Sequence, residues 1–304
     1  MQQKIVWVLL FVSLFSLHRN LRSEEIATFH PKLSIKLSGG LGCVAGGSIN
    51  KHLRTYDTYL SEMTDYRGGE TKALHLGSDL EGEIRWKISP KFALSAGTGY
   101  FFGKNKSYFE FWGPFPFHLP FEHGQSYIIS PRIKTIPLKI GINYTFPSRS
   151  RINPFFDIGI GYYFSKATLY KAHWSSCYGP EFLIFTKEEK FDLKARGFGF
   201  HGGLGVEYNL ANNLALVIEV QGRYSRTRIT GKSISSIWEM AWVEEEGDLF
   251  IGERDLLGEG YGERCPDLIV SQSRPSGDEF QNIRTAVLDL SGISMRVGMR
   301  IKLF

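Results

Sequence analysis

The sequence lacks the features that most often identify an enzyme, a metalloprotein or a helical membrane protein. It has no run of about 18 or more apolar residues, so no transmembrane helix is available. It also lacks the GxSxG, HExxH and P-loop motifs. The three cysteines, Cys43, Cys177 and Cys265, have neither zinc-site nor redox-motif spacing. We therefore expect no enzymatic activity, no metal and no cofactor.

The N-terminus has the pattern of a secretory signal peptide. Lys4 precedes an apolar segment from Ile5 to Leu17, which is too short to span a bilayer as a helix. We place cleavage after Ser23, so that residues 1–23 are the signal peptide and residues 24–304 the mature domain. The mature chain then has 33 basic and 31 acidic residues, since the signal contains three basic residues and no acid. This near-neutral balance gives no support for nucleic-acid binding.

Residues 197–224 alternate between apolar residues and polar or glycine residues with a period of two. Phe198, Phe200, Leu204 and Val206 alternate with glycine and polar residues, and the alternation resumes after residues 211–213. Successive side chains of a strand point to opposite faces, so this segment predicts a hairpin with one apolar face. Each arm has the length of about 10 residues that a tilted transmembrane strand needs. A soluble barrel or sandwich core remains the alternative at this point.

Eight segments of this kind occur, and the connections between them alternate in length. The segments are residues 32–45, 74–88, 91–103, 135–146, 154–166, 197–210, 214–224 and 286–304. The long connections are residues 46–73, 104–126, 170–190 and 231–284. We therefore predict an all-β fold: a closed antiparallel eight-stranded transmembrane β-barrel with short periplasmic turns and long extracellular loops.

Three stretches resemble the small eight-stranded outer-membrane barrels of the OmpA-transmembrane, OmpX and OmpW kind. They are residues 154–163 (PFFDIGIGYY), 203–224 and 297–304. The resemblance implies a bacterial outer-membrane location. It also implies contact with outer-membrane lipid, including lipopolysaccharide, and with the barrel-assembly machinery during biogenesis.

On the barrel interpretation, one set of charged residues shares the inward face. It comprises Lys36, Asp79, Glu81, Glu83, Arg85, Lys139, Asp157, Glu207, Glu219, Arg223, Arg296 and Arg300. At eight strands the interior is just filled by side chains, so we expect a mutually neutralising network. A narrow path for ions or small solutes is the alternative. We expect Glu219 to pair with Arg296 or Arg300, because their strands are expected to be neighbours.

The long connections carry the remaining candidate features. Cys177 and Cys265 both lie in them, so a disulfide between the two is a hypothesis in an oxidising compartment. Residues 109–121 are rich in aromatics and proline, which suits a barrel mouth, the lipid interface or a partner surface. The acidic residues from Glu244 to Glu263 favour a solvated loop over a Ca²⁺ or Mg²⁺ site.

These features together predict the function. We expect a structural or surface-exposed binding or anchoring role, with an extracellular ligand that the sequence does not identify. A narrow channel is the second hypothesis. An enzyme that modifies outer-leaflet lipid is the third, although His118, His123 and His173 lie in no recognisable motif with serine and acid.

Overall fold

The fold is known from a computed structural model. The described residues are 33–63, 68–70, 72–114, 122–146, 148, 151–177, 183–237, 241–255, 264–278 and 280–303. They belong to one compact unit, residues 31–304, whereas the expected signal peptide lies outside the described residues. The described part has fifteen strands in one sheet and one helix, α2 (Ser48–Met63), so the fold is all-β. No helix in these ranges is long and apolar enough to cross a membrane.

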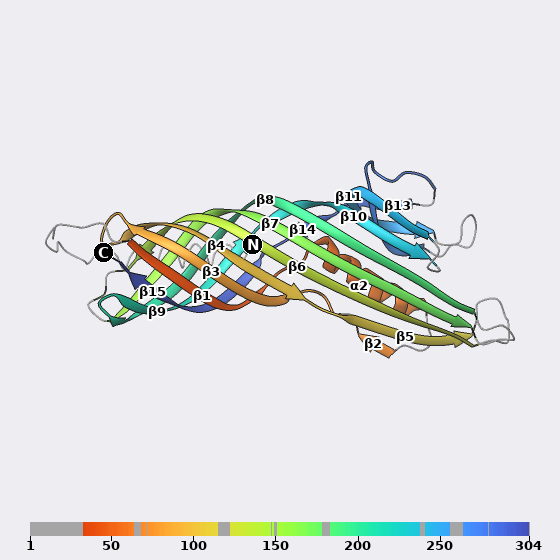
Figure 1. The fold of residues 1–304 in the computed structure, drawn as a ribbon, viewed down its shortest axis with the longest axis horizontal. Helices are drawn as coiled ribbons and strands as arrows, with labels where there is room; N and C mark the ends of the chain where they lie inside the picture. Colours follow the sequence, from red (N-terminus) through yellow and green to blue (C-terminus); the bar gives the residue numbers. More distant parts are fainter. Residues whose placement is uncertain are drawn as a thin grey trace, which may run out of the picture. The chain divides into compact units, whose positions relative to one another are not determined.

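Eight long strands form a continuous circuit of antiparallel pairs. Each pairs with the next, and the last pairs with the first. In circuit order they are β1 (Leu33–Cys43), β3 (Leu76–Lys87), β4 (Phe92–Lys104), β6 (Glu122–Thr145), β7 (Ile152–Cys177), β8 (Leu183–Ala211), β9 (Leu214–Tyr224) and β15 (Gly292–Lys302). They occupy the eight segments expected from the sequence and run side by side, obliquely, in Figure 1.

The two faces of this circuit differ as the alternation predicts. Apolar side chains on the outward face are well exposed, including Leu37 at 65%, Phe198 at 73% and Leu204 at 62%. Inward neighbours such as Lys36 and Arg296 are 1% exposed. An exposed apolar band of this extent, on strands whose polar side chains are buried, is the reverse of a water-soluble sheet.

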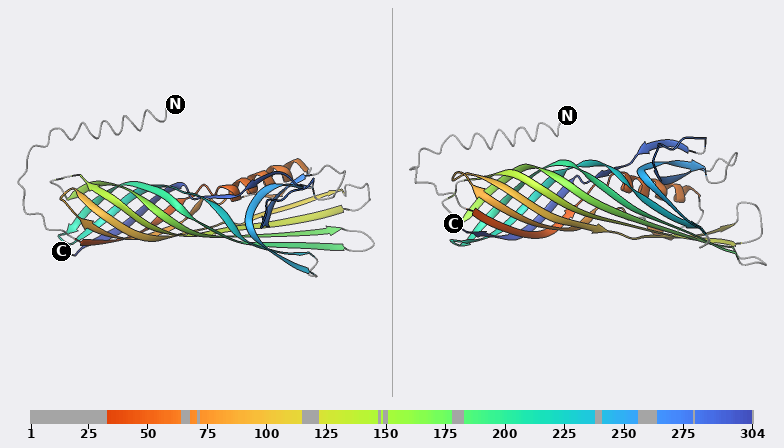
Figure 2. Two further views of the ribbon diagram at one scale, coloured as in Figure 1. Left: turned by 90° about the horizontal axis from the view of Figure 1, so that it is seen from above. Right: turned by 45° about the horizontal axis from the view of Figure 1, so that its top comes forward.

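The prediction of four long loops is wrong in large part, because most of the residues assigned to them belong to strands or to α2. β6, β7 and β8 have 24, 26 and 29 residues and continue past the other circuit strands, as Figures 1 and 2 show. The region expected as one loop over residues 231–284 contains most of β10 (Arg226–Ile237), followed by β11 (Ala241–Asp255), β12 (Arg264–Ser271) and most of β13 (Phe280–Thr285). Three short strands complete the sheet: β2 (Gly68–Glu70), β5 (Ser107–Pro114) and β14 (Val287–Asp289).

The strand extensions were missed because their apolar side chains change face. In β8, Phe198 and Phe200 point outward, whereas Phe191 and Leu193 are buried at 2% and 0% exposure on the opposite parity. The same inversion separates Phe164 from Leu169 in β7 and Ile136 from Ile133 in β6. Each strand therefore passes from a surface that is apolar outside to one that is apolar inside. We call this change the parity inversion.

Candidate functional site: the interior of the strand circuit

The structure brings the twelve charged residues of the expected network together inside the circuit. Six are acids and six are bases, so their formal charges cancel. Eleven make ion pairs within the set, and Asp157 accepts a hydrogen bond from Gln221 at 3.3 Å. This pairing offsets the large cost of removing each charge from water.

Arg296 is at the centre of the network. Its Nη1 lies 2.6 Å from Glu81 Oε2, and its Nε lies 2.8 Å from Glu219 Oε1. The Lys36 Nζ contacts the same two acids, at 3.1 Å from Glu81 and 2.7 Å from Glu219. Lys139 also pairs with Glu81. Three cations thus surround two carboxylates, and the expected pair between Glu219 and Arg296 is present.

A second group lies nearer the short-turn end. The Arg85 Nη1 is 2.9 Å from Glu207 Oε1, and the Arg85 Nη2 is 3.0 Å from Glu83 Oε1. Arg300 pairs with the same two acids. The ring of Phe155, which is 1% exposed, has its centroid 5.1 Å from the Arg85 guanidinium carbon and borders the network at this end. Phe155 shares the inward parity of Asp157, so the alternation contained this signal.

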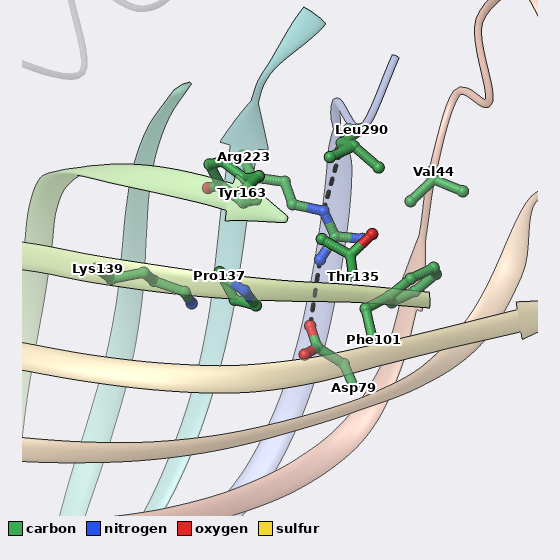
Figure 3. A pocket seen from close by; sticks show the side chains of 9 residues that line it. All are labelled: Val44, Asp79, Phe101, Thr135, Pro137, Lys139, Tyr163, Arg223 and Leu290. Atoms are coloured by element: carbon green, nitrogen blue, oxygen red, sulfur yellow. Dashed lines mark hydrogen bonds and ion pairs between the residues drawn. The ribbon is translucent and has the colours of Figure 1, made fainter. Parts of the chain in front are cut away.

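The opposite end of the network is bordered by Phe101 and Tyr163. There Arg223 Nη1 lies 3.3 Å from Asp79 Oδ2, and Arg223 Nε donates a hydrogen bond of 2.9 Å to the Leu290 carbonyl (Figure 3). The Arg223 guanidinium carbon is 4.7 Å from the Phe101 ring centroid. These side chains line a cavity of about 10 Å³, the room that a single water molecule needs. Aromatic side chains therefore border the charged network at both ends.

The comparison with known proteins identifies the family. A family model described as outer membrane protein beta-barrel domain matches residues 28–237. The chain belongs to this family. As an outer membrane protein beta-barrel domain it lies in the bacterial outer membrane, which places the outward apolar band of the strands in lipid.

The comparison with solved structures finds several outer-membrane proteins at low identity. OprG from Pseudomonas aeruginosa is 10% identical, with 90% of this chain and 97% of that chain covered and a TM-score of 0.35. A major outer membrane protein from Thermus thermophilus is 11% identical, with 90% and 100% covered and a TM-score of 0.38. Neisserial surface protein A is 8% identical, with 90% and 100% covered and a TM-score of 0.33. No curated protein sequence matches this chain significantly.

Beyond the parity inversion, this outer-membrane domain has an apolar core. Leu53 of α2, Leu193 of β8 and Leu249 of β11 are 0% exposed within it. The chain enters α2 through Gly46 and Gly47, whose φ angles of 72° and 60° favour glycine. The helix packs against β12 and β14.

The Asn50 side chain connects α2 by hydrogen bonds to the segments that precede and follow the helix. Its Nδ2 donates to the carbonyls of Ala45 at 2.8 Å and Leu74 at 2.7 Å, while its Oδ1 accepts from the Leu74 backbone N–H at 2.8 Å. Ser48 Oγ accepts a further hydrogen bond of 2.9 Å from the Val287 N–H. The helix is therefore an integral part of the apolar core, which also includes Phe101 and Tyr163 at the border of the charged network.

We expect the α2 region to loosen in acid because of His52. Burial, followed by the positive charge of Lys171, holds the pKa of His52 well below its ordinary value, so the folded state keeps the ring neutral. The unfolded segment binds a proton below about pH 6.5. His52 therefore leaves the free energy of unfolding unchanged above that pH. Below it, the free energy of unfolding falls by up to about 1.4 kcal/mol per pH unit. Limited proteolysis of α2 between pH 7.5 and 5 measures this change.

A His52→Leu variant separates this effect from other titrations. Lys171 also faces two acids, Glu189 at 3.7 Å and Asp267 at 3.9 Å, and burial raises the pKa of Asp267. Glu189 and Asp267 remain in the variant, whereas the protonation of His52 no longer contributes to its pH dependence. An acid sensitivity equal in both proteins would show that His52 is not its source.

The other expected site features have separate outcomes. Cys43 is a free cysteine, and its Sγ accepts a hydrogen bond of 3.3 Å from the Ile293 N–H. The side chains of Cys177 and Cys265 lie outside the described residues, so their disulfide stays a hypothesis. The same is true of residues 115–121, which include His118, and of the His123 side chain.

The described part of the acidic segment, up to residue 255, belongs to a strand and not to a loop. Glu244 and Glu246 belong to β11, and Lys232 of β10 pairs with them at 3.0 and 3.2 Å. Within the described ranges, no group of three His, Cys, Asp or Glu residues could hold a metal ion.

Proposed function

We propose that the circuit of eight strands is a closed transmembrane barrel that does not conduct, and that it anchors a rigid β-structure outside the cell for binding a surface partner. The interior carries this proposal. Eleven of its twelve charged side chains form ion pairs with one another, Phe155 borders one end, and the α2 core covers the other. A solute would have to displace paired charges and a packed core, which is costly.

The strand extensions support the binding role. The short turns, the start of β1 and the end of β15 lie on one side, which we assign to the periplasm. The extensions of β6, β7 and β8 then project away from the cell. From Phe164 to Cys177, β7 advances about 40 Å at roughly 3.3 Å per residue. A mobile loop loses conformational entropy on binding, whereas a packed sheet has already lost it, so an interface on the extension is preorganised.

Planar-bilayer recording of the refolded mature protein tests the proposal. We expect no conductance steps under conditions in which a general porin, reconstituted in parallel, gives open channels. Steps of constant size from protein with heat-modifiable gel mobility would support a narrow channel instead. A mobility unaffected by boiling would contradict the closed barrel itself. The proposal includes no catalytic role, and lipid modification by the protein would overturn that part.

A further inference from the structure

A group of basic side chains faces outward on four neighbouring strands, just beyond the apolar band. We call it the basic belt, and it comprises Lys104 of β4, Arg132 and Lys134 of β6, Lys166 of β7, and Lys194 and Arg196 of β8. All six are exposed. The belt therefore spans contiguous strands and is not a scatter of single charges.

The belt begins where the apolar band ends. Lys134 is two residues from outward-facing Ile136, and Lys166 is two residues from outward-facing Phe164. Two residues of a strand advance about 7 Å on the same face. The parity inversion occurs over the same part of these strands. The change of the outward face from apolar to basic thus marks a lipid–water boundary, and the belt lies on the side of it away from the short turns.

Three lysines of the belt are directly opposite one another. Lys134 is in register with Lys166, and Lys166 is in register with Lys194. Like charges in this arrangement repel and destabilise a sheet. None of the three forms an ion pair with a carboxylate in the described part of the chain. Asp192, one same-face step along β8, pairs with Lys190 at 3.7 Å. The interior balances its charges, whereas no carboxylate of the described residues neutralises these three lysines.

We propose that the basic belt binds the phosphate groups of a phosphorylated lipid in the outer leaflet. This assignment rests on the orientation given in the proposed function. Adjacent strands are about 4.8 Å apart, so the ammonium groups of Lys134, Lys166 and Lys194 can converge on one phosphate or on a pair. Ammonium groups are strong donors to phosphate oxygens, and the apolar band directly below contacts the acyl chains of the same lipid.

The test compares two triple variants of the full mature protein refolded in detergent micelles. One is Lys134→Gln with Lys166→Gln and Lys194→Gln. The control is Lys51→Gln with Lys190→Gln and Lys232→Gln, which removes the same charge from exposed lysines outside the belt. Microscale thermophoresis measures binding of lipid A with both phosphates, of lipid A without phosphates, and of inorganic phosphate.

We expect the wild-type protein and the control to prefer the phosphorylated lipid by about tenfold, and the belt variant to lose that preference. Equal binding by both variants, or no preference in the wild type, would overturn the proposal. Inorganic phosphate that binds as tightly as the lipid would make the ligand a free anion and also overturn it. Conductance recorded on the same samples reports separately on the proposed function, so the two failures are distinguishable.

Discussion

Replacing Arg296 by methionine lowers the free energy of unfolding by about 3–5 kcal/mol, the usual cost of removing one partner from a buried ion pair. Methionine keeps most of the side-chain volume, so the loss comes from charge and not from a cavity. Arg296 is 1% exposed and contacts Glu81 and Glu219 within 2.8 Å. Urea titration in detergent micelles, read by heat-modifiable gel mobility, measures the change.

Two further variants make this test specific. Arg226 pairs with Asp289 at 3.6 Å, but its side chain is 58% exposed, so Arg226→Met costs about 0–1 kcal/mol. Adding Glu219→Gln to Arg296→Met removes one of the uncompensated acids, and the double variant should be less destabilised than the sum of the two single variants. If Arg296→Met lowered the free energy of unfolding no more than Arg226→Met does, the interior would be hydrated and its ion pairs dispensable.

Replacing Leu204 by arginine destabilises the protein by about 2–4 kcal/mol, the cost of a cation on the lipid face near the bilayer midplane. Leu204 is 62% exposed and lies midway along the outward apolar residues of β8, from Phe198 to Leu210. The same titration in lipid bilayers measures the effect. In a water-soluble sheet, an exposed arginine at this position would be harmless.

Thr230→Arg is the matched control for the lipid face. Thr230 is exposed and outward on β10, in register with Lys194 of the basic belt, and therefore lies beyond the apolar band. We expect a change within about 0.5 kcal/mol there. Equal effects at Leu204 and Thr230 would contradict the position of the membrane boundary.

The transmembrane strands and their two faces could be predicted because long apolar side chains alternate there with charges and glycine. Leu76, Leu80 and Ile84 of β3, for example, are outward and exposed, while Glu81 is buried. The pairing of Glu219 with Arg296 followed from parity and from the adjacency of two late strands. Neither inference required knowledge of tertiary structure.

The extension and α2 were not predicted, for different physical reasons. In β7 and β8 the apolar side chains change face, and small residues such as Ala167 and Ala195 fill some of the inward positions and contribute little hydrophobicity. The helix carries a signal that could have been recognised, because Ile49, Leu53 and Tyr56 are spaced by four and three residues. Which strands the helix covers depends on tertiary packing, which local periodicity does not encode.

The distribution of the charged network over the chain has a consequence for the order of folding. Lys36 is on the first circuit strand, Glu219 is on the seventh, and both Arg296 and Arg300 are on the last. Until β15 joins β1 and β9, Glu81 and Glu219 lack a cation that surrounds them in the finished protein. A partly assembled sheet would therefore expose unbalanced charge to the bilayer, so insertion and closure are expected to occur in one cooperative step.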